Sequence, residues 1–90
     1  MKILASEAVA KWLVGLPPQT KRRVRAALRG LAKGRGDIKA LAGDLEGFCR
    51  LRVGGLRLVY RHLPGQIIQI EYTDTRDMVH ESFLRILENA

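Results

Sequence analysis

The segment from Phe48 to Arg61 constrains the fold of this chain more than any other part of the sequence. Large apolar residues alternate with arginines on both sides of a Gly54-Gly55 pair. This period of two predicts two β-strands, because successive side chains of a strand point to opposite faces of a sheet, and the glycines predict a tight hairpin turn. The alternation gathers four arginines on one face of that hairpin: Arg50, Arg52, Arg57 and Arg61. A planar guanidinium group matches phosphate geometry, so the sequence predicts a sheet face that can hold a phosphate backbone.

Helical signals precede this hairpin. Ser6 is a suitable N-cap for a helix over 7–15, whose apolar residues recur at helical spacing. Leu16-Pro17-Pro18 ends this helix, and Pro18 is suited to the first turn of a second one. That second helix is amphipathic and basic, and the glycines at 34 and 36 end it. The short connection predicts an antiparallel helical hairpin.

The complete pattern predicts an α+β fold in the order β-α-α-β-β-β-α, with helices on one face of an antiparallel sheet. A short first strand covers 2–5, a connection covers 37–47, three strands cover 48–53, 56–62 and 66–73, and a last helix covers 76–87. One sheet face carries Arg50, Arg52, Arg57, Arg61, Gln69 and Glu71. The other faces the helices and carries Cys49, Leu51, Val53, Leu56, Leu58, Tyr60, Ile68, Ile70 and Tyr72.

Length and charge narrow the classes of function. The 90 residues suffice for one domain, 1–90, and the sixteen lysines and arginines against nine acids give a net charge of +7. This charge favours an anionic partner, either a nucleic acid or an acidic protein. Cys49 is the only cysteine, so no internal disulfide forms. No signal peptide or membrane span is predicted, and we expect a cytoplasmic protein without a membrane partner.

The chain resembles the RelE/ParE superfamily of toxins from toxin–antitoxin systems. The resemblance covers nearly the whole chain, and its most specific parts are the Arg50-Leu51-Arg52 and Leu56-Arg57-Leu58-Val59-Tyr60 strands. Further matches are the break at Leu16-Pro17-Pro18, the approach from Leu41 to Phe48, and the segment from Asp74 to His80. The resemblance implies a RelE-like fold and a cognate antitoxin protein as partner.

Two activities follow from this resemblance. The RelE branch comprises endoribonucleases (mRNA interferases) that cut messenger RNA in the ribosomal decoding site, whereas the ParE branch inhibits DNA gyrase. We expect the first: metal-independent, ribosome-dependent cleavage that inhibits translation, without a cofactor. The alternatives are a non-nuclease gyrase inhibitor that acts by binding a protein, and a degenerate module that binds only its antitoxin.

The resemblance also implies roles for particular residues. Arg57 matches an arginine that stabilises the phosphate transition state, and Arg50 matches a basic catalytic residue on the preceding strand. Arg76 matches the basic residue after the last strand, and His80 matches a residue that transfers protons. Arg52 and Arg61 are expected to contact RNA.

Several other residues have alternative roles. Glu71 is either a base or an ion-pair partner of Arg57 or Arg61, and the ion pair is favoured. Tyr60, Tyr72 and Cys49 are expected to pack in the core, and His62 to belong to a turn. The basic helix face is expected to be solvated, with ribosomal RNA as an alternative contact. It carries Arg22, Arg25, Arg29 and Lys33. The sequence contains no set of residues with metal-ligand spacing and no phosphate-binding glycine loop.

Overall fold

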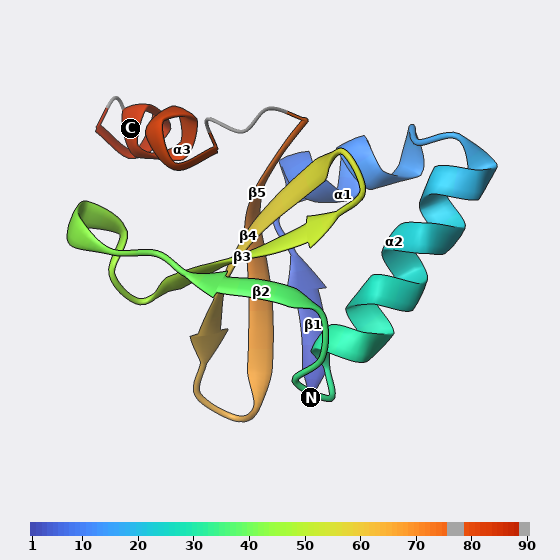
Figure 1. Cartoon of the computed structure of the whole chain (residues 1–90), viewed down its shortest axis with the longest axis horizontal. Helices are drawn as coiled ribbons and strands as arrows, with labels where there is room; N and C mark the ends of the chain where they lie inside the picture. Colours follow the sequence, from blue (N-terminus) through green and yellow to red (C-terminus); the bar gives the residue numbers. More distant parts are fainter. Residues whose placement is uncertain (76–78, 89–90) are drawn as a thin grey trace.

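The structure is a computed structural model that describes residues 1–75 and 79–88. For residues 79–81 it describes the backbone alone. A helical hairpin packs against one face of a five-stranded sheet, and a further helix lies across the sheet from it (Figure 1). The elements are β1 (Lys2–Ala5), α1 (Glu7–Val14), α2 (Pro18–Leu31), β2 (Asp37–Ala40), a 3₁₀ turn η1 (Gly43–Leu45), β3 (Phe48–Val53), β4 (Leu56–Leu63), β5 (Ile67–Asp74) and α3 (Val79–Glu88).

The sheet order is β1-β5-β4-β3-β2. The predicted antiparallel meander of β3, β4 and β5 is confirmed, each strand lying within one residue of its predicted bounds. β1 pairs in parallel with β5, so the sheet is mixed rather than wholly antiparallel. This pairing joins the beginning of the chain to its last strand, and such a long-range partner has no local sequence signal.

The predicted connection over 37–47 contains an additional strand. Residues 37–40 form β2, which pairs antiparallel with the outer edge of β3, with Ile38 opposite Leu51. All four residues of β2 are exposed, so the strand has no buried alternating face that could have revealed it. Its pairing with β3 places Asp37 and Lys39 beside the arginines of that strand.

The helical hairpin follows the sequence signals closely. The Ser6 hydroxyl accepts a hydrogen bond from the Val9 backbone N–H, at 3.3 Å, and caps α1 as predicted. α2 begins at Pro18. The main hydrophobic core lies between this hairpin and the sheet. It contains Val9, Val24, Leu31, Leu51, Leu58, Tyr60, Ile68 and Ile70.

A β-bulge in β5 changes the predicted face of Tyr72. Val59 pairs with Tyr72, but the next residue, Tyr60, pairs with Ile70, so Glu71 is the extra residue. One inserted residue reverses the alternation beyond it. The prediction that Tyr72 faces the helical hairpin is therefore wrong: Tyr72 lies on the arginine-bearing face with Val59.

A second, smaller hydrophobic cluster lies on that face beneath α3. Leu45, Val59 and Phe83 are its buried members. The Phe83 ring stacks on Tyr72 at 5.5 Å between ring centres and meets Phe48 edge-on at 5.1 Å. The expectation that all helices share one face is therefore wrong for α3. The reversed orientation of Tyr72 provides the apolar surface on which α3 packs.

None of the helices within residues 1–75 and 79–88 has both the length and the apolar character that a membrane span requires.

Candidate nucleic-acid-binding face

Strand register brings the four sequence-predicted arginines to one face of β3 and β4. Arg52 lies opposite Arg57, Arg50 lies opposite Val59, and Arg61 lies opposite Phe48. These cross-strand partners share a face in an antiparallel pair. Lys39, which lies opposite Arg50 on β2, adds a fifth cation. Sequence reasoning missed Lys39 because β2 was taken for a connection.

Arg50 and Arg61 form ion pairs. Arg50 Nη2 lies 3.2 Å from Asp37 Oδ1, with its side chain about one-fifth exposed. Arg61 Nε lies 3.5 Å from Glu71 Oε1, and the Arg61 guanidinium also lies over the Phe48 ring, 6.0 Å from its centre. The ion pair favoured for Glu71 is thus present, and it originates from the bulge position. Exposed ion pairs are worth about 0–1 kcal/mol, so an approaching phosphate can compete with Glu71 for the more exposed Arg61 guanidinium.

Arg57 has a different environment from the other three. It is only 6% exposed, and its Nη1 donates hydrogen bonds to the carbonyls of Gly54 at 3.2 Å and Leu56 at 3.3 Å. Asp74, itself 9% exposed, lies directly opposite Arg57 in the β4–β5 register. A buried guanidinium and a buried carboxylate on neighbouring strands form the polar centre of this face.

Asp74 links this centre to Tyr72. The Tyr72 hydroxyl donates a hydrogen bond to Asp74 Oδ2 at 2.9 Å, and the Thr75 backbone N–H donates one to Oδ1 at 2.7 Å. Sequence reasoning named Asp74 only as the start of the matched segment up to His80 and treated Tyr72 as a core residue. The alternation of apolar residues gave no signal for the bulge that brings them together.

Arg52 is the arginine of this face most available to a ligand. Its side chain is exposed, and it makes no ion pair within residues 1–75 or the described part of α3. Arg76 lies outside the described residues, and the side chain of His80 is outside them too. Their roles remain predictions.

The other candidate side chains lie on the opposite face or at its edge. Tyr60 is buried, and its pKa is raised to about 12. Burial is the largest cause, and the charge of Cys49 and its hydrogen bond with Tyr60 add to the rise. Tyr60 is therefore protonated at neutral pH. His62 is exposed within β4 rather than in a turn. Among the described residues, no three side chains of the usual metal-ligating types gather in one place.

Among the comparisons with known proteins, only those with solved structures found matches. No protein-family model matches the sequence, and no curated protein matches it either. Solved structures do match. They include the archaeal RelE–RelB complex from Pyrococcus horikoshii OT3, which has a TM-score of 0.69 at 23% identity and covers 84% of this chain and 94% of that one.

Two further structures belong to other organisms. The RelBE2 toxin–antitoxin complex from Mycobacterium tuberculosis has a TM-score of 0.69 at 25% identity, covering 83% of this chain and 90% of that one. The YoeB–YefM complex from Staphylococcus aureus has a TM-score of 0.66 at 19% identity, covering 82% and 94%.

The fold and the basic sheet face define a small α+β protein suited to an anionic ligand. The similar solved structures identify the fold more closely: the chain has the fold of the RelE/ParE superfamily of toxins. The RelE-like fold that the sequence resemblance implied is thereby confirmed.

Proposed function

We propose that this chain is the toxin of a toxin–antitoxin pair and that it cleaves messenger RNA on the ribosome without a metal ion. The observation that supports this proposal most is the convergence of Arg50, Arg52, Arg57 and Arg61 on one sheet face. In metal-independent RNA cleavage, the 2′-hydroxyl oxygen attacks the adjacent phosphate and the 5′-oxygen leaves. The transition state carries additional negative charge on the phosphate, which fixed cations stabilise. The net charge of +7 favours the approach of RNA in general.

The proposed roles of Arg52 and Arg61 rest on their exposed side chains, and those of Arg50, Arg57, Arg76 and His80 on the resemblance to the RelE branch. Arg52 and Arg61 contact the RNA backbone from the exposed part of the face. Arg57 stabilises the transition state, and Arg50 assists it from β3. Arg76 and His80 complete the site through the segment that follows β5, with His80 transferring a proton.

The test is expression of the chain with mapping of messenger 5′ ends. We expect growth arrest with new 5′ ends within coding regions, and Arg57→Ala to lower the cleavage rate by about 10²- to 10³-fold. Arg52→Gln provides an independent test, because the exposed Arg52 side chain can be replaced without leaving a buried charge unpaired. Lys11→Gln is the matched control, since Lys11 lies exposed on α1. Intact messengers during growth arrest would exclude the nuclease.

A gyrase inhibitor of the ParE type is the second candidate, and the burial of Arg57 favours it. A guanidinium that donates to the carbonyls of its own hairpin has a structural use that requires no catalysis. Induction of the DNA-damage response with unbroken messengers would support this candidate. Absence of toxicity with retained antitoxin binding would instead support a degenerate binding module.

We infer an antitoxin as the cognate partner in either case. The similar structure from Mycobacterium tuberculosis is a toxin–antitoxin complex, and the one from Pyrococcus horikoshii is a RelE–RelB complex. The basic surface described above suits an acidic partner. Co-purification with the product of an adjacent reading frame tests this inference, and a failure of the two proteins to associate would contradict it.

A further inference from the structure

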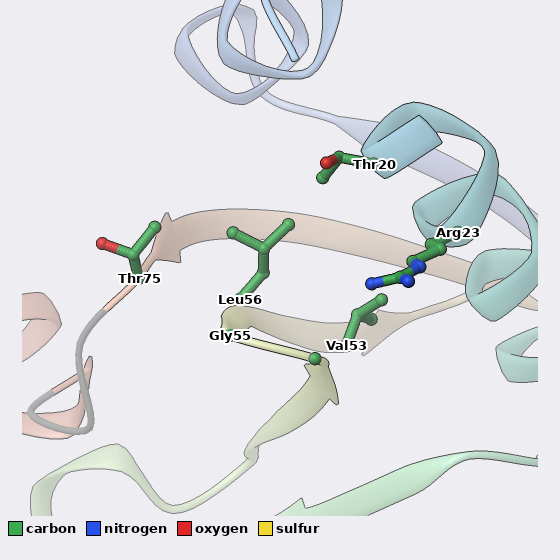
Figure 2. Close-up of a pocket in the computed structure, with 7 residues that line it drawn as sticks. Thr20, Arg23, Val53, Gly55, Leu56 and Thr75 are labelled. Carbon is green, nitrogen blue, oxygen red and sulfur yellow. The ribbon is translucent and has the colours of Figure 1, made fainter. Parts of the chain in front are cut away.

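A cavity lies on the side of the sheet that packs against the helical hairpin. It has a volume of about 400 Å³ and lies between the first turns of α2 and the turn that joins β3 to β4. Figure 2 shows Thr20 and Arg23 entering from α2, Val53, Gly55 and Leu56 from the hairpin, and Thr75 from the end of β5. The volume is within the range of about 300–1,000 Å³ that is typical of ligand pockets.

The two sides of this cavity differ in chemistry. Val53 and Leu56 form an apolar wall and are only partly buried against the main core. Opposite them, Arg23 extends from the exposed side of α2, and its guanidinium points into the cavity (Figure 2). Arg23 makes no ion pair with any described residue. The cavity therefore offers one cation beside an apolar surface.

The turn between β3 and β4 leaves this space open. A Cβ atom added at Gly54 or Gly55 would meet no atom within 4 Å, so no described residue fills the space beside these glycines. The first turn of α2 contains no acidic residue, and Pro17 gives it no side-chain cap. No acidic side chain of this turn therefore competes for the Arg23 guanidinium.

We propose that this cavity binds a segment of an acidic partner protein that carries a carboxylate next to a large apolar side chain. The apolar side chain packs on Val53 and Leu56, and the carboxylate pairs with Arg23 and accepts a hydrogen bond from the Thr20 hydroxyl. The proposal rests on the proposed function in one respect: the partner is expected to be the antitoxin. A nucleotide phosphate fits less well, because the Val53 and Leu56 wall offers it no polar contact.

The test uses short peptides as probes and needs neither toxicity nor RNA cleavage. The capped tetrapeptide Ac-Ala-Leu-Glu-Ala-NH₂ is titrated into the isotope-labelled full chain to about 10 mM while methyl and amide NMR signals are followed, since dissociation constants near 1 mM correspond to contacts of this size. We expect shifts at Val53, Leu56 and Thr20. The analogue with Gln in place of Glu binds about three- to fivefold more weakly, and the one with Ala in place of Leu about tenfold.

Protein variants test the role of the cation. Arg23→Gln is expected to remove the preference for Glu over Gln, whereas Arg22→Gln keeps it, because Arg22 is exposed on α2 but does not line the cavity. Both substitutions replace exposed helix residues, so both variants should fold.

Three outcomes would overturn the proposal. They are shifts confined to the β3–β4 arginine face, equal binding of the Glu and Gln peptides, and tighter binding of uridine monophosphate than of the Glu peptide. A chain that lacks nuclease activity but binds the Glu peptide through Arg23 would refute the proposed activity and leave this site intact.

Discussion

Arg57, Tyr72 and Asp74 form a buried polar group that links β4 to β5. The carboxylate of Asp74 accepts two hydrogen bonds at 2.9 and 2.7 Å, and Arg57 lies opposite it in the strand register. Buried charges are tolerated when each is paired and hydrogen-bonded. The orientation of Arg57 therefore depends on residues of the neighbouring strand as well as on its own hairpin.

Tyr72→Phe tests this dependence at the level of a single hydroxyl. The substitution keeps the aromatic ring stacked on Phe83 and removes one donor to a buried carboxylate. We expect the free energy of unfolding to fall by about 1–2 kcal/mol, measured by urea denaturation. An unchanged urea midpoint would show that the hydroxyl contributes nothing to the polar group.

Tyr60 provides a pH-dependent prediction. Its pKa is raised in the folded protein to about 12, mainly by burial, whereas the unfolded chain titrates near the ordinary value of 10.0. Between these pH values the unfolded state loses the proton and the folded state keeps it, so the stability falls as the pH rises from 10 towards 12 and is fully present below 10. Denaturation of the parent and of Tyr60→Phe over this range isolates the effect. The stability of the parent should decline relative to that of the variant, and parallel curves would contradict the prediction.

At the scale of elements, local alternation predicted the strands well and their long-range relations less well. β3 and β4 were predictable because each alternates apolar and charged residues around a glycine turn. The bulge at Glu71 was not, since every residue around it is compatible with a regular strand. β2 has no buried face, and the packing side of α3 depends on where Tyr72 points. The sequence thus predicted the shared face of the four arginines and missed Lys39, Tyr72 and Asp74.

The connection between α2 and β2 supplies the element-scale prediction. Gly36 has a φ of +132°, and a Cβ there would lie 2.9 Å from Leu51 Cδ1, whereas Gly34 has a φ of +73° with open space around it. Both conformations disfavour a side chain, but Gly36 adds a contact with the core. We expect Gly34→Ala to cost about 1 kcal/mol and Gly36→Ala about 2–3 kcal/mol in thermal or urea unfolding. Equal losses would mean that Leu51 moves aside freely.

At the scale of the whole molecule, the sheet is covered on both faces, but unequally. The helical hairpin covers one face broadly, whereas α3 covers the other through a small cluster around Phe83. Arg52, Lys39 and Arg61 remain exposed on this second face. The molecule therefore combines a well-packed side with a cationic surface whose apolar centre is closed by α3.

The salt dependence of RNA binding tests whether this cationic surface is the one that contacts RNA. Each phosphate neutralised on a single strand contributes about −0.7 to the slope of log affinity against log salt concentration. We therefore expect Arg52→Gln to reduce the magnitude of the slope by about 0.7 for a short single-stranded RNA, measured by fluorescence anisotropy. Lys11→Gln should leave the slope unchanged, because Lys11 lies on α1 and pairs with Glu7 at 3.5 Å. A loss of slope on Arg25→Gln, with none on Arg52→Gln, would instead place the RNA on the exposed face of α2.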